Sequence, residues 1–373
     1  MRNKKYFLAI FVVFGLLVIL PVGNYIYYNW AYNRAYRVFV APQHTTPVVT
    51  LNSRLLPKYK NEMLRKILNE NPQEFLLVYG NSSQFHLREE VFSAALGCSL
   101  KPFFNMSHHS IDYLDAQYFF RSISADVSEG WTVLLGVYPD MFTKQARTAT
   151  PSIDHPWNNS MLWFENIRDG NTSVSSLFPR LINIEWPVNA QTWFPFLRQY
   201  SDIYELATRG KSDEFLYSDG SVQFIGADET RHARVAAGNS LDADNFRMIA
   251  LQNLSSPFDE RLLKAFEETV TMLMRHGARV IAYEAELTDY LGGARWAEPS
   301  HVGRYLDLMQ RLQRSSPDFN YLEKSRTWIN LPEEYWLDGS HVSFEGGEQI
   351  VRHLSGLIGA DAMCAKGLHE GEG

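Results

Sequence analysis

The chain has 373 residues, of which 45% are hydrophobic and 14% aromatic, so it can bury a sizeable core as one large domain or two smaller ones. This composition excludes an intrinsically disordered chain. The net charge of −7, without a stripe of clustered Lys and Arg, argues against a nucleic-acid partner, because phosphate binding needs concentrated positive charge.

Residues 6–22 form an unbroken apolar run, which is at the short end of what spans a bilayer. Basic residues precede the run and Tyr and Trp residues follow it at positions 25–30, as expected for a helix whose N-terminus stays in the cytoplasm. A cleaved signal peptide is the alternative, although no clear small-x-small cleavage site follows. We interpret residues 1–30 as an N-terminal membrane anchor. With either interpretation the remaining chain lies outside the cytoplasmic membrane, in the periplasm or the extracellular space.

The next part of the chain alternates strands with helices. Residues 31–70 are interpreted as a stalk with a leading helix. The elements predicted here are, in chain order, a helix over 58–69, a strand over 74–80, a helix over 87–96, a strand over 101–105, a helix over 111–124 and a strand over 131–138. The first strand is apolar on both faces, which is typical of a central parallel strand. The alternation predicts an open doubly wound sheet with its ligand site at the carboxyl ends of the strands.

The alternation stops at residues 139–256, which we interpret as an insertion over the active face. Its predicted elements are helical pieces around 175–182 and 195–208 and a hairpin over 215–224. After it we expect a helix over 257–276, a strand over 278–283, a loop over 291–293, a helix over 301–314, a strand over 319–322 and a helix over 346–358. The predicted fold is α/β, with a doubly wound, flavodoxin-like, mostly parallel five-stranded sheet and a large insertion after the third strand. This domain covers residues 71–361, and residues 362–373 form a C-terminal tail.

Asp338 and His341 stand three residues apart between an aromatic turn and the start of the last predicted helix. The spacing lets the carboxylate reach Nδ1 of the imidazole, which fixes its tautomer and leaves Nε2 to take a proton from a nucleophile. Such pairs also occur in ordinary surface loops. The catalytic interpretation therefore requires a nucleophile elsewhere, on a sharp strand-to-helix turn.

Ser82 stands two residues after Gly80 at the end of the first predicted strand. This position exposes the hydroxyl at the carboxyl edge of the sheet, where backbone N–H groups of the following turn point at an incoming carbonyl oxygen. An ordinary capping serine is the alternative. In a doubly wound sheet the first strand is central and the loop before the last helix rises beside it, so we expect Ser82 and His341 to meet.

With these residues the sequence resembles the SGNH (GDSL-like) hydrolase superfamily, in its divergent branch of membrane-anchored proteins that act on cell-surface polymers. The resemblance rests on Gly80-Asn81-Ser82, where the family has Gly-Asp-Ser, on the second block at residues 105–110, and on Asp338-Gly339-Ser340-His341. It covers residues 75–138 and 257–358 but not the insertion.

The resemblance implies that Ser82 is the nucleophile, His341 the general base and Asp338 the residue that orients the imidazole. It implies an oxyanion hole made by the backbone N–H of Ser82 or Ser83 and a group from the second block. The other candidates to line the site are Asn105, His108, His109, Ser110 and Asp140. Residues 136–140 read Gly-Val-Tyr-Pro-Asp where hydrolytic members have Gly-x-Asn-Asp, so one usual oxyanion donor is replaced. This departure weighs against simple hydrolysis more than against acyl transfer.

The implied function is that of an extracytoplasmic serine acyltransferase or esterase, which adds or removes an O-acyl group, expected to be acetyl, on a polysaccharide of a bacterial cell envelope. D-alanyl transfer is a narrower variant. Members of this branch often work beside a membrane-bound O-acyltransferase, so the expected partners are such an enzyme, the cytoplasmic membrane and the surface glycan. The alternative is a non-catalytic envelope assembly or glycan-binding protein that keeps the fold, which the altered third block favours.

We expect neither a cofactor nor a metal. The adjacent His108 and His109 invite a metal interpretation, but no Asp, Glu or Cys stands near them in ligand spacing, and a role in the loop is the alternative. The two cysteines follow the first and last helices, which pack on the same face of a sheet ordered 2-1-3-4-5. Cys98 and Cys364 are therefore expected either to form a disulfide or to remain two thiols.

Overall fold

Five parallel strands form the central sheet of the computed structural model, which describes residues 15, 48–50, 56–108, 113–143, 214–224 and 257–366. The strands are β2 (Glu74–Tyr79), β3 (Phe103–Asn105), β4 (Gly130–Gly136), β7 (Arg279–Tyr283) and β8 (Phe319–Leu322). Their order is β3-β2-β4-β7-β8, and every neighbouring pair is parallel. This is the predicted doubly wound α/β sheet, with the insertion after its third strand in chain order.

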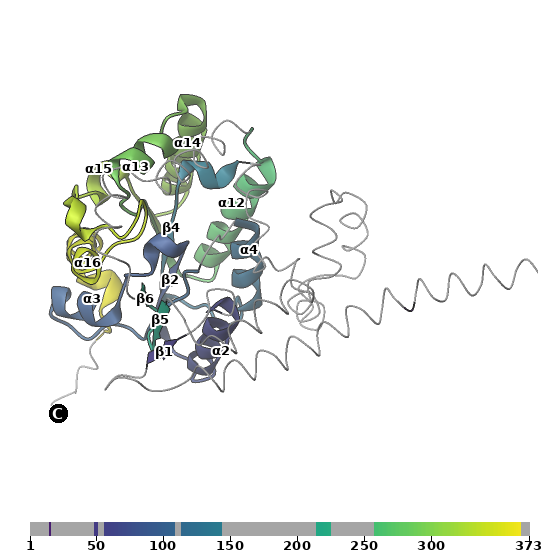
Figure 1. Ribbon diagram of the computed structural model, residues 1–373. Coiled ribbons are helices and arrows are strands. Elements are labelled where there is room, and N and C mark those ends of the chain that lie inside the picture. The colour runs from purple at the N-terminus through teal and green to yellow at the C-terminus, as the bar shows by residue number, and fades with distance from the viewer. Residues whose placement is uncertain are drawn as a thin grey trace, which may run out of the picture.

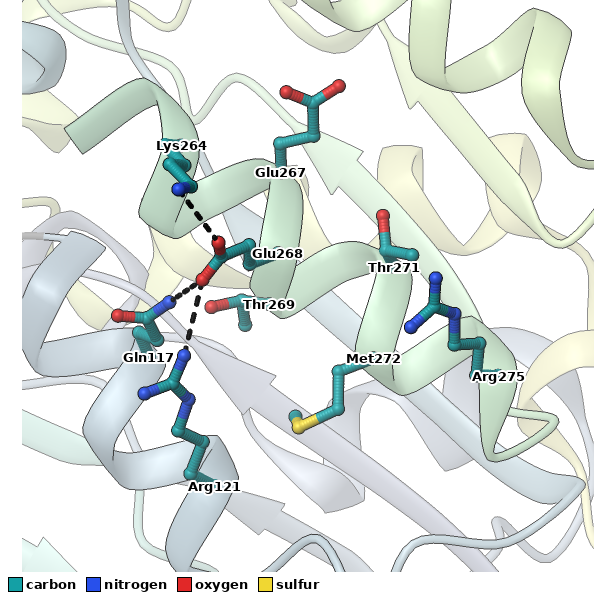
Figure 2. Close-up of a pocket in the computed structure, with 9 residues that line it drawn as sticks. All are labelled: Gln117, Arg121, Lys264, Glu267, Glu268, Thr269, Thr271, Met272 and Arg275. Carbon is teal, nitrogen blue, oxygen red and sulfur yellow. Dashed lines mark hydrogen bonds and ion pairs between the residues drawn. The ribbon is translucent and has the colours of Figure 1, made fainter. Parts of the chain in front are cut away.

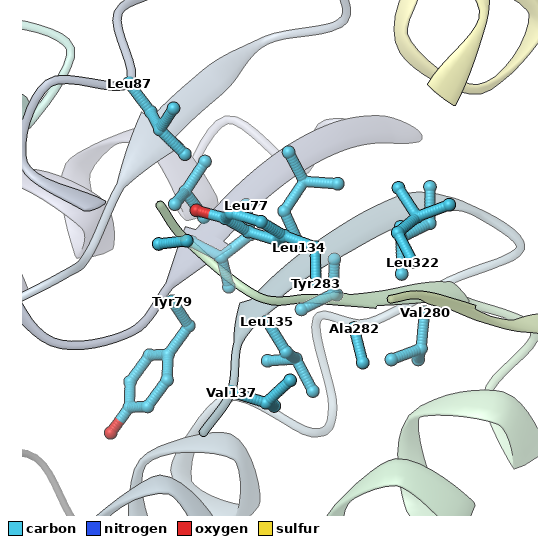
Figure 3. Packing of buried hydrophobic residues seen from close by; sticks show 14 of the residues in the cluster. Leu77, Tyr79, Leu87, Leu134, Leu135, Val137, Val280, Ala282, Tyr283 and Leu322 are labelled. Carbon is cyan, nitrogen blue, oxygen red and sulfur yellow. The ribbon is translucent and has the colours of Figure 1, made fainter. Parts of the chain in front are cut away.

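The strands are apolar on both faces because helices cover both sides of the sheet. In β4, Leu134 and Leu135 point to opposite faces, and both are buried (Figure 3). In β2 the residues from Phe75 to Val78 are all inaccessible to solvent. A parallel sheet buried in this way leaves its strand ends as the main place where polar side chains gather.

Two pairs of helices cover the sheet, as Figure 1 shows: α3 (Glu89–Leu96) and α16 (Phe344–Ile358) lie on one face, and α4 (Tyr113–Ser122) and α12 (Glu260–Arg275) on the other. The other helices are α2 (Leu56–Leu68), α13 (Asp289–Arg295), α14 (Pro299–Ser315), α15 (Lys324–Thr327) and α17 (Ala360–Met363). The described residues also form the 3-10 turns η1 (Ser82–Gln84), η2 (Pro139–Phe142) and η4 (Glu333–Tyr335). Capping sets the helix starts: the Ser343 side chain accepts a hydrogen bond from the N–H of Gly346 at the start of α16.

The leading helix expected within residues 31–70 packs against the sheet. Leu64 and Leu68 of α2 belong to the hydrophobic core, so this helix is part of the domain. Upstream of it, β1 (Val48–Thr50) pairs antiparallel with β5 (Glu214–Tyr217), which continues into β6 (Val222–Phe224). The hairpin predicted over 215–224 is thus confirmed, and the segment interpreted as a stalk supplies its third strand.

The loop predicted over residues 291–293 is wrong, because these residues lie in helix α13. Two adjacent glycines favoured a loop in the sequence. In the structure Gly292 is needed for packing, since a Cβ atom there would lie 2.2 Å from a ring carbon of Trp328. A close approach between a helix and an aromatic ring is invisible to local sequence patterns.

A disulfide joins Cys98 to Cys364, whose Cα atoms are 6.0 Å apart. Backbone hydrogen bonds fasten the same two segments, because the N–H of Lys101 donates to Met363 O at 3.0 Å and that of Ala365 donates to Ser99 O at 2.9 Å. The crosslink follows from helices α3 and α16 lying on the same face, as the strand order predicts.

Several predictions fall outside the described residues. They concern the anchor over 6–22, the helical pieces at 175–182 and 195–208, and the positions of His109 and Ser110. Within the described part of the chain, no helix has the length and apolar character needed to cross a bilayer.

Candidate active site

Ser82 is the first residue of the turn that follows central strand β2. The turn is shaped by Asn81, whose side-chain oxygen accepts a hydrogen bond from the N–H of Ser83 at 3.0 Å. Because β2 ends at Tyr79, Ser82 lies at the carboxyl edge of the sheet, where doubly wound folds place their ligands.

Asp338 and His341 contact each other in the loop before α16. Asp338 Oδ2 lies 2.5 Å from His341 Nδ1, while its other oxygen accepts the backbone N–H groups of Ser340 at 2.8 Å and His341 at 2.9 Å. Burial would raise the pKa of the Asp338 carboxyl, but the charge of His341 and these hydrogen bonds hold the pKa at about 2. The loop is anchored to the start of α13 by its N-cap residue Thr288, whose N–H and hydroxyl both donate to Gly339 O at 3.1 Å.

Ser82 and His341 line one pocket at the carboxyl end of β2, as the sequence predicts. The pocket is small, with a volume of about 20 Å³, which is room for about one water molecule. Its opposite wall is formed by Val222 and Gln223 of the β5–β6 hairpin. The insertion thus supplies part of the pocket, in agreement with its predicted place over the active face.

Three hydrogen bonds fasten the hairpin to neighbouring segments, two between backbone groups and one to a side chain. The N–H of Val222 donates to Phe85 O at 3.0 Å, and the N–H of Asn105 donates to Asp219 O at 2.7 Å. The Asp219 side chain also accepts a hydrogen bond from the N–H of Glu89, in the first turn of α3, at 2.9 Å. Such contacts between distant segments have no local sequence signal.

Ser83 and Asn105, two of the predicted site residues, are occupied by structural contacts and do not line the pocket. The Ser83 hydroxyl bonds to Asn81 and lies 2.7 Å from the Tyr138 hydroxyl. The Asn105 amide donates to Gln84 O at 2.8 Å and Leu87 O at 3.0 Å, and its oxygen accepts the N–H of Ser107. Both side chains hold the turn that carries Ser82 in place.

Asp140 lies further back, beneath the turn. It is buried and pairs with Arg295 at 3.4 Å, and the same guanidinium lies 4.3 Å from the ring centroid of Tyr138. Burial raises the pKa of the Tyr138 hydroxyl to about 12, partly offset by Arg295, so this group keeps its proton when it contacts Ser83. Asp140 therefore acts on the turn through Arg295 and Tyr138.

His108 belongs to the second block and is buried beside β2. Its N–H donates to Gly80 O at 3.1 Å, which ties the second block to the residue that precedes the turn with Ser82. Within the described ranges no three His, Cys, Asp or Glu side chains gather in a way that could hold a metal ion.

Gln84 fills the space behind the turn, and sequence patterns did not single it out. Its side chain is fully buried between two glycines: a Cβ atom on Gly80 would lie 2.4 Å from Gln84 Oε1, and one on Gly136 would lie 2.3 Å from Gln84 Nε2. The glycine of the altered third block is thus required by the fold. Only the spacing of Gly80 and Gly136 at the ends of two adjacent strands could have suggested a shared neighbour.

His86 and Arg88 also line the pocket and were missed. His86 is partly exposed, but its Nε2 is buried. Burial, and secondarily the charge of His341, lower the pKa of His86 to about 3, so this imidazole is neutral at physiological pH. The available signal was a His and an Arg shortly after a candidate nucleophile, in a segment that leads into a helix.

A larger hollow of about 590 Å³ lies between α4 and α12, away from Ser82 (Figure 2). Three of its charged groups pair with one another: Glu268 accepts a hydrogen bond from Gln117 at 2.6 Å and pairs with Arg121 at 3.2 Å and Lys264 at 3.6 Å. Exposed ion pairs of this kind are typical of a solvated helix surface. Volume is therefore a poorer guide to the chemistry here than the arrangement around Ser82.

No family model matches this chain, and no curated protein is similar to it. The pocket holds a serine on a sharp turn and a histidine paired with a partly buried carboxylate, which together are suited to nucleophilic attack on an acyl carbon.

Proposed function

We propose that this protein is a serine acyltransferase or esterase that moves an O-acyl group, expected to be acetyl, on a cell-envelope polysaccharide. The observation that carries the proposal is the shared pocket of Ser82 and His341, with Asp338 fixing the imidazole at 2.5 Å. The resemblance of the three sequence blocks to SGNH hydrolases supports the same chemistry. Two chain segments far apart in sequence thus supply complementary groups.

In the proposed mechanism Ser82 Oγ attacks the acyl carbon while His341 Nε2 takes the hydroxyl proton. The tetrahedral intermediate collapses, His341 returns the proton to the departing alcohol oxygen, and the acyl group is left as an ester on Ser82. A sugar hydroxyl or water then attacks this ester, with His341 again accepting and returning one proton. Asp338 stays ionised and stabilises the imidazolium that forms in both steps.

We assign the N–H of Ser82 as the donor that stabilises the oxyanion of the tetrahedral intermediate, because the N–H of Ser83 already donates to Asn81. Preorganised donors of this kind contribute about 3 kcal/mol each to transition-state stabilisation. A second donor from the substrate or from the hairpin wall at Gln223 would complete the hole. This arrangement replaces the asparagine that hydrolytic relatives place in the third block.

The proposed place of action is the outer side of the cytoplasmic membrane, with residues 1–30 as a single-pass anchor and the N-terminus inside. The disulfide between Cys98 and Cys364 supports this location, because such bonds persist in oxidising compartments. A membrane-bound O-acyltransferase that exports the acyl group is the proposed partner.

One observation favours a non-catalytic envelope or glycan-binding protein. The pocket has a volume of only about 20 Å³ and the hairpin closes over it, so a polymer does not fit in this conformation. Catalysis requires the hairpin to shift, whereas a scaffold protein does not.

The test treats the full chain, in detergent, with a biotinylated phosphonofluoridate, followed by peptide mass spectrometry and by assays with acetyl esters. We expect a single adduct on Ser82 and its loss in Ser82→Ala. The matched control Ser122→Ala removes an exposed serine and is expected to label normally. An unlabelled Ser82, together with full biological complementation by Ser82→Ala, would establish the non-catalytic alternative instead.

A further inference from the structure

Arg88 presents a largely buried guanidinium to the pocket that holds Ser82 and His341. The group lies between two aromatic rings, 4.4 Å from the ring centroid of Tyr217 in β5 and 4.5 Å from that of Phe344 in α16. Stacking on both faces fixes the plane of the guanidinium and leaves its edge to make hydrogen bonds.

Only one part of that edge has a partner. Nη2 pairs with Glu90 at 2.5 Å, whereas Nε and Nη1 are buried and have no hydrogen-bond partner within the described residues. The Arg88 side chain is 13% exposed, so solvent satisfies little of it. Buried cationic donors without an acceptor are costly, and native proteins keep them where a ligand or function uses them.

Arg88 supplies a permanent positive charge to the pocket, and most of the other side chains that line it are uncharged. Phe85, Val222, Val342 and Phe344 are apolar, and His86 is neutral because burial lowers its pKa to about 3. Among the described residues no carboxylate lines this pocket, and the side chain of the partner Glu90 is 62% exposed. The pocket is therefore suited to a negative charge beside the acyl group.

We infer that Arg88 binds an anionic group of the substrate, a carboxylate or a phosphate, next to the acyl ester that Ser82 attacks. This inference rests on the proposed function and narrows its substrate to an acidic glycan, either uronate-containing or phosphate-containing. A planar anion accepts two parallel hydrogen bonds from a guanidinium edge, which matches the two donors that lack a partner. The ring contacts with Tyr217 and Phe344 also help to fasten the hairpin. Stacking involves the faces of the guanidinium, however, so hairpin packing does not explain why two N–H donors at its edge lack a partner.

The kinetic test compares 4-acetoxybenzoate with its neutral methyl ester on the full chain in detergent. We expect the wild type to prefer the anionic ester in kcat/KM, and Arg88→Gln to lower this preference about tenfold or more, mainly through KM. Arg88→Lys keeps the charge and is expected to retain part of the preference. Two controls are Arg311→Gln, which removes an exposed arginine, and Tyr217→Leu, which removes one stacking ring and keeps the charge. An equal loss for both esters in Arg88→Gln would assign Arg88 to hairpin packing and overturn the inference.

A binding test does not depend on turnover. Calorimetry on the Ser82→Ala chain uses trigalacturonate for the carboxylate source, glycerol 3-phosphate for the phosphate source, and methyl-esterified trigalacturonate as the neutral control. Binding of either anion that is lost in Ser82→Ala/Arg88→Gln supports the inference, even if the wild type turns over no ester and only the proposed function fails. The inference is overturned, while the proposed function is kept, if the chain turns over esters but shows no preference that depends on Arg88 and binds neither anion.

Discussion

Asp338 Oδ2 lies 2.5 Å from Nδ1 of His341, and the backbone N–H of the same histidine donates to the other carboxylate oxygen at 2.9 Å. Both carboxylate oxygens of Asp338 therefore bind His341, which fixes the tautomer of the imidazole as well as its orientation. The pKa of the carboxyl, about 2, keeps it ionised at neutral pH.

Replacing Asp338 by Asn tests this pairing. An amide presents a donor or a weaker acceptor to Nδ1, favours the wrong tautomer and no longer stabilises the imidazolium, so we expect kcat to fall by about 10³-fold or more. The fold is expected to persist, because the amide oxygen still accepts the N–H groups of Ser340 and His341. Ester turnover and thermal melting of the same samples check both statements. A variant that keeps more than about a tenth of wild-type kcat would contradict the assigned role.

The contact between Gln84 and Gly136 gives a prediction about stability. A methyl group at position 136 would lie 2.3 Å from Gln84 Nε2 in a fully buried setting, so we expect Gly136→Ala to lower the free energy of unfolding by about 1–3 kcal/mol. Adding Gln84→Ala removes the obstructing atoms. The double variant should lose less than the sum of the single losses, as measured by urea unfolding. The matched control Gly303→Ala places a methyl group in open space within α14, and strictly additive losses would argue against the contact.

Glu284 predicts a dependence of stability on pH. Burial raises its pKa to about 8, although hydrogen bonds from Tyr321 and Tyr305 oppose the shift. Between pH 4.5 and about 8 the folded chain keeps a proton that the unfolded chain releases, so the stabilisation present below pH 4.5 is lost as pH rises through 8.

Glu284→Gln removes this titration while keeping an oxygen for the two tyrosines. Relative to wild type, we expect the variant to gain about 4 kcal/mol in the free energy of unfolding between pH 5 and pH 9. Urea unfolding at pH 5, 7 and 9 provides the measurement. Glu334→Gln, at an exposed position, serves as the control and should give a flat difference across the series. A flat difference for Glu284→Gln as well would mean that the buried carboxyl ionises normally.

Periodicity and apolar runs predicted the parts of the fold that depend on local pattern. The strand expected over residues 319–322 is β8 at the same bounds, and the apolar run after residue 73 is central because its residues are buried on both faces. The contact between Asp338 and His341 was predictable because three residues separate the groups within one loop. Chain order then placed Ser82 beside them.

The features of the site that the sequence did not predict depend on contacts between distant segments. Ser83 and Asn105 were candidates for the oxyanion site, but a sequence does not show that their polar groups are used by Asn81, Tyr138 and two backbone carbonyls. Local sequence patterns do not single out Arg88, because the residues around it come from β5 and α16, which are far away in the chain.

Asp219 fastens the hairpin over the pocket, so its removal is expected to loosen the hairpin. Its carboxylate accepts the N–H of Glu89 at 2.9 Å and the N–H and hydroxyl of Ser221, so it caps the start of α3 from another segment. Asp219→Ala is expected to cost about 1 kcal/mol of stability and, more specifically, to loosen the hairpin. Amide hydrogen exchange should accelerate at Val222, whose N–H donates to Phe85 O, and remain unchanged in β4.

The same variant probes access to the nucleophile, because Val222 and Gln223 form the wall opposite Ser82 and His341. We expect faster labelling of Ser82 by the phosphonofluoridate in Asp219→Ala than in Asp318→Ala, which removes an exposed aspartate away from the hairpin. Since the charge of Asp219 is the second cause, after burial, that raises the pKa of Glu89, that pKa should also fall in the variant. Faster labelling would show that the hairpin limits entry to a pocket of about 20 Å³. Unchanged exchange at Val222 and unchanged labelling would show instead that the hairpin is held by its backbone contacts alone.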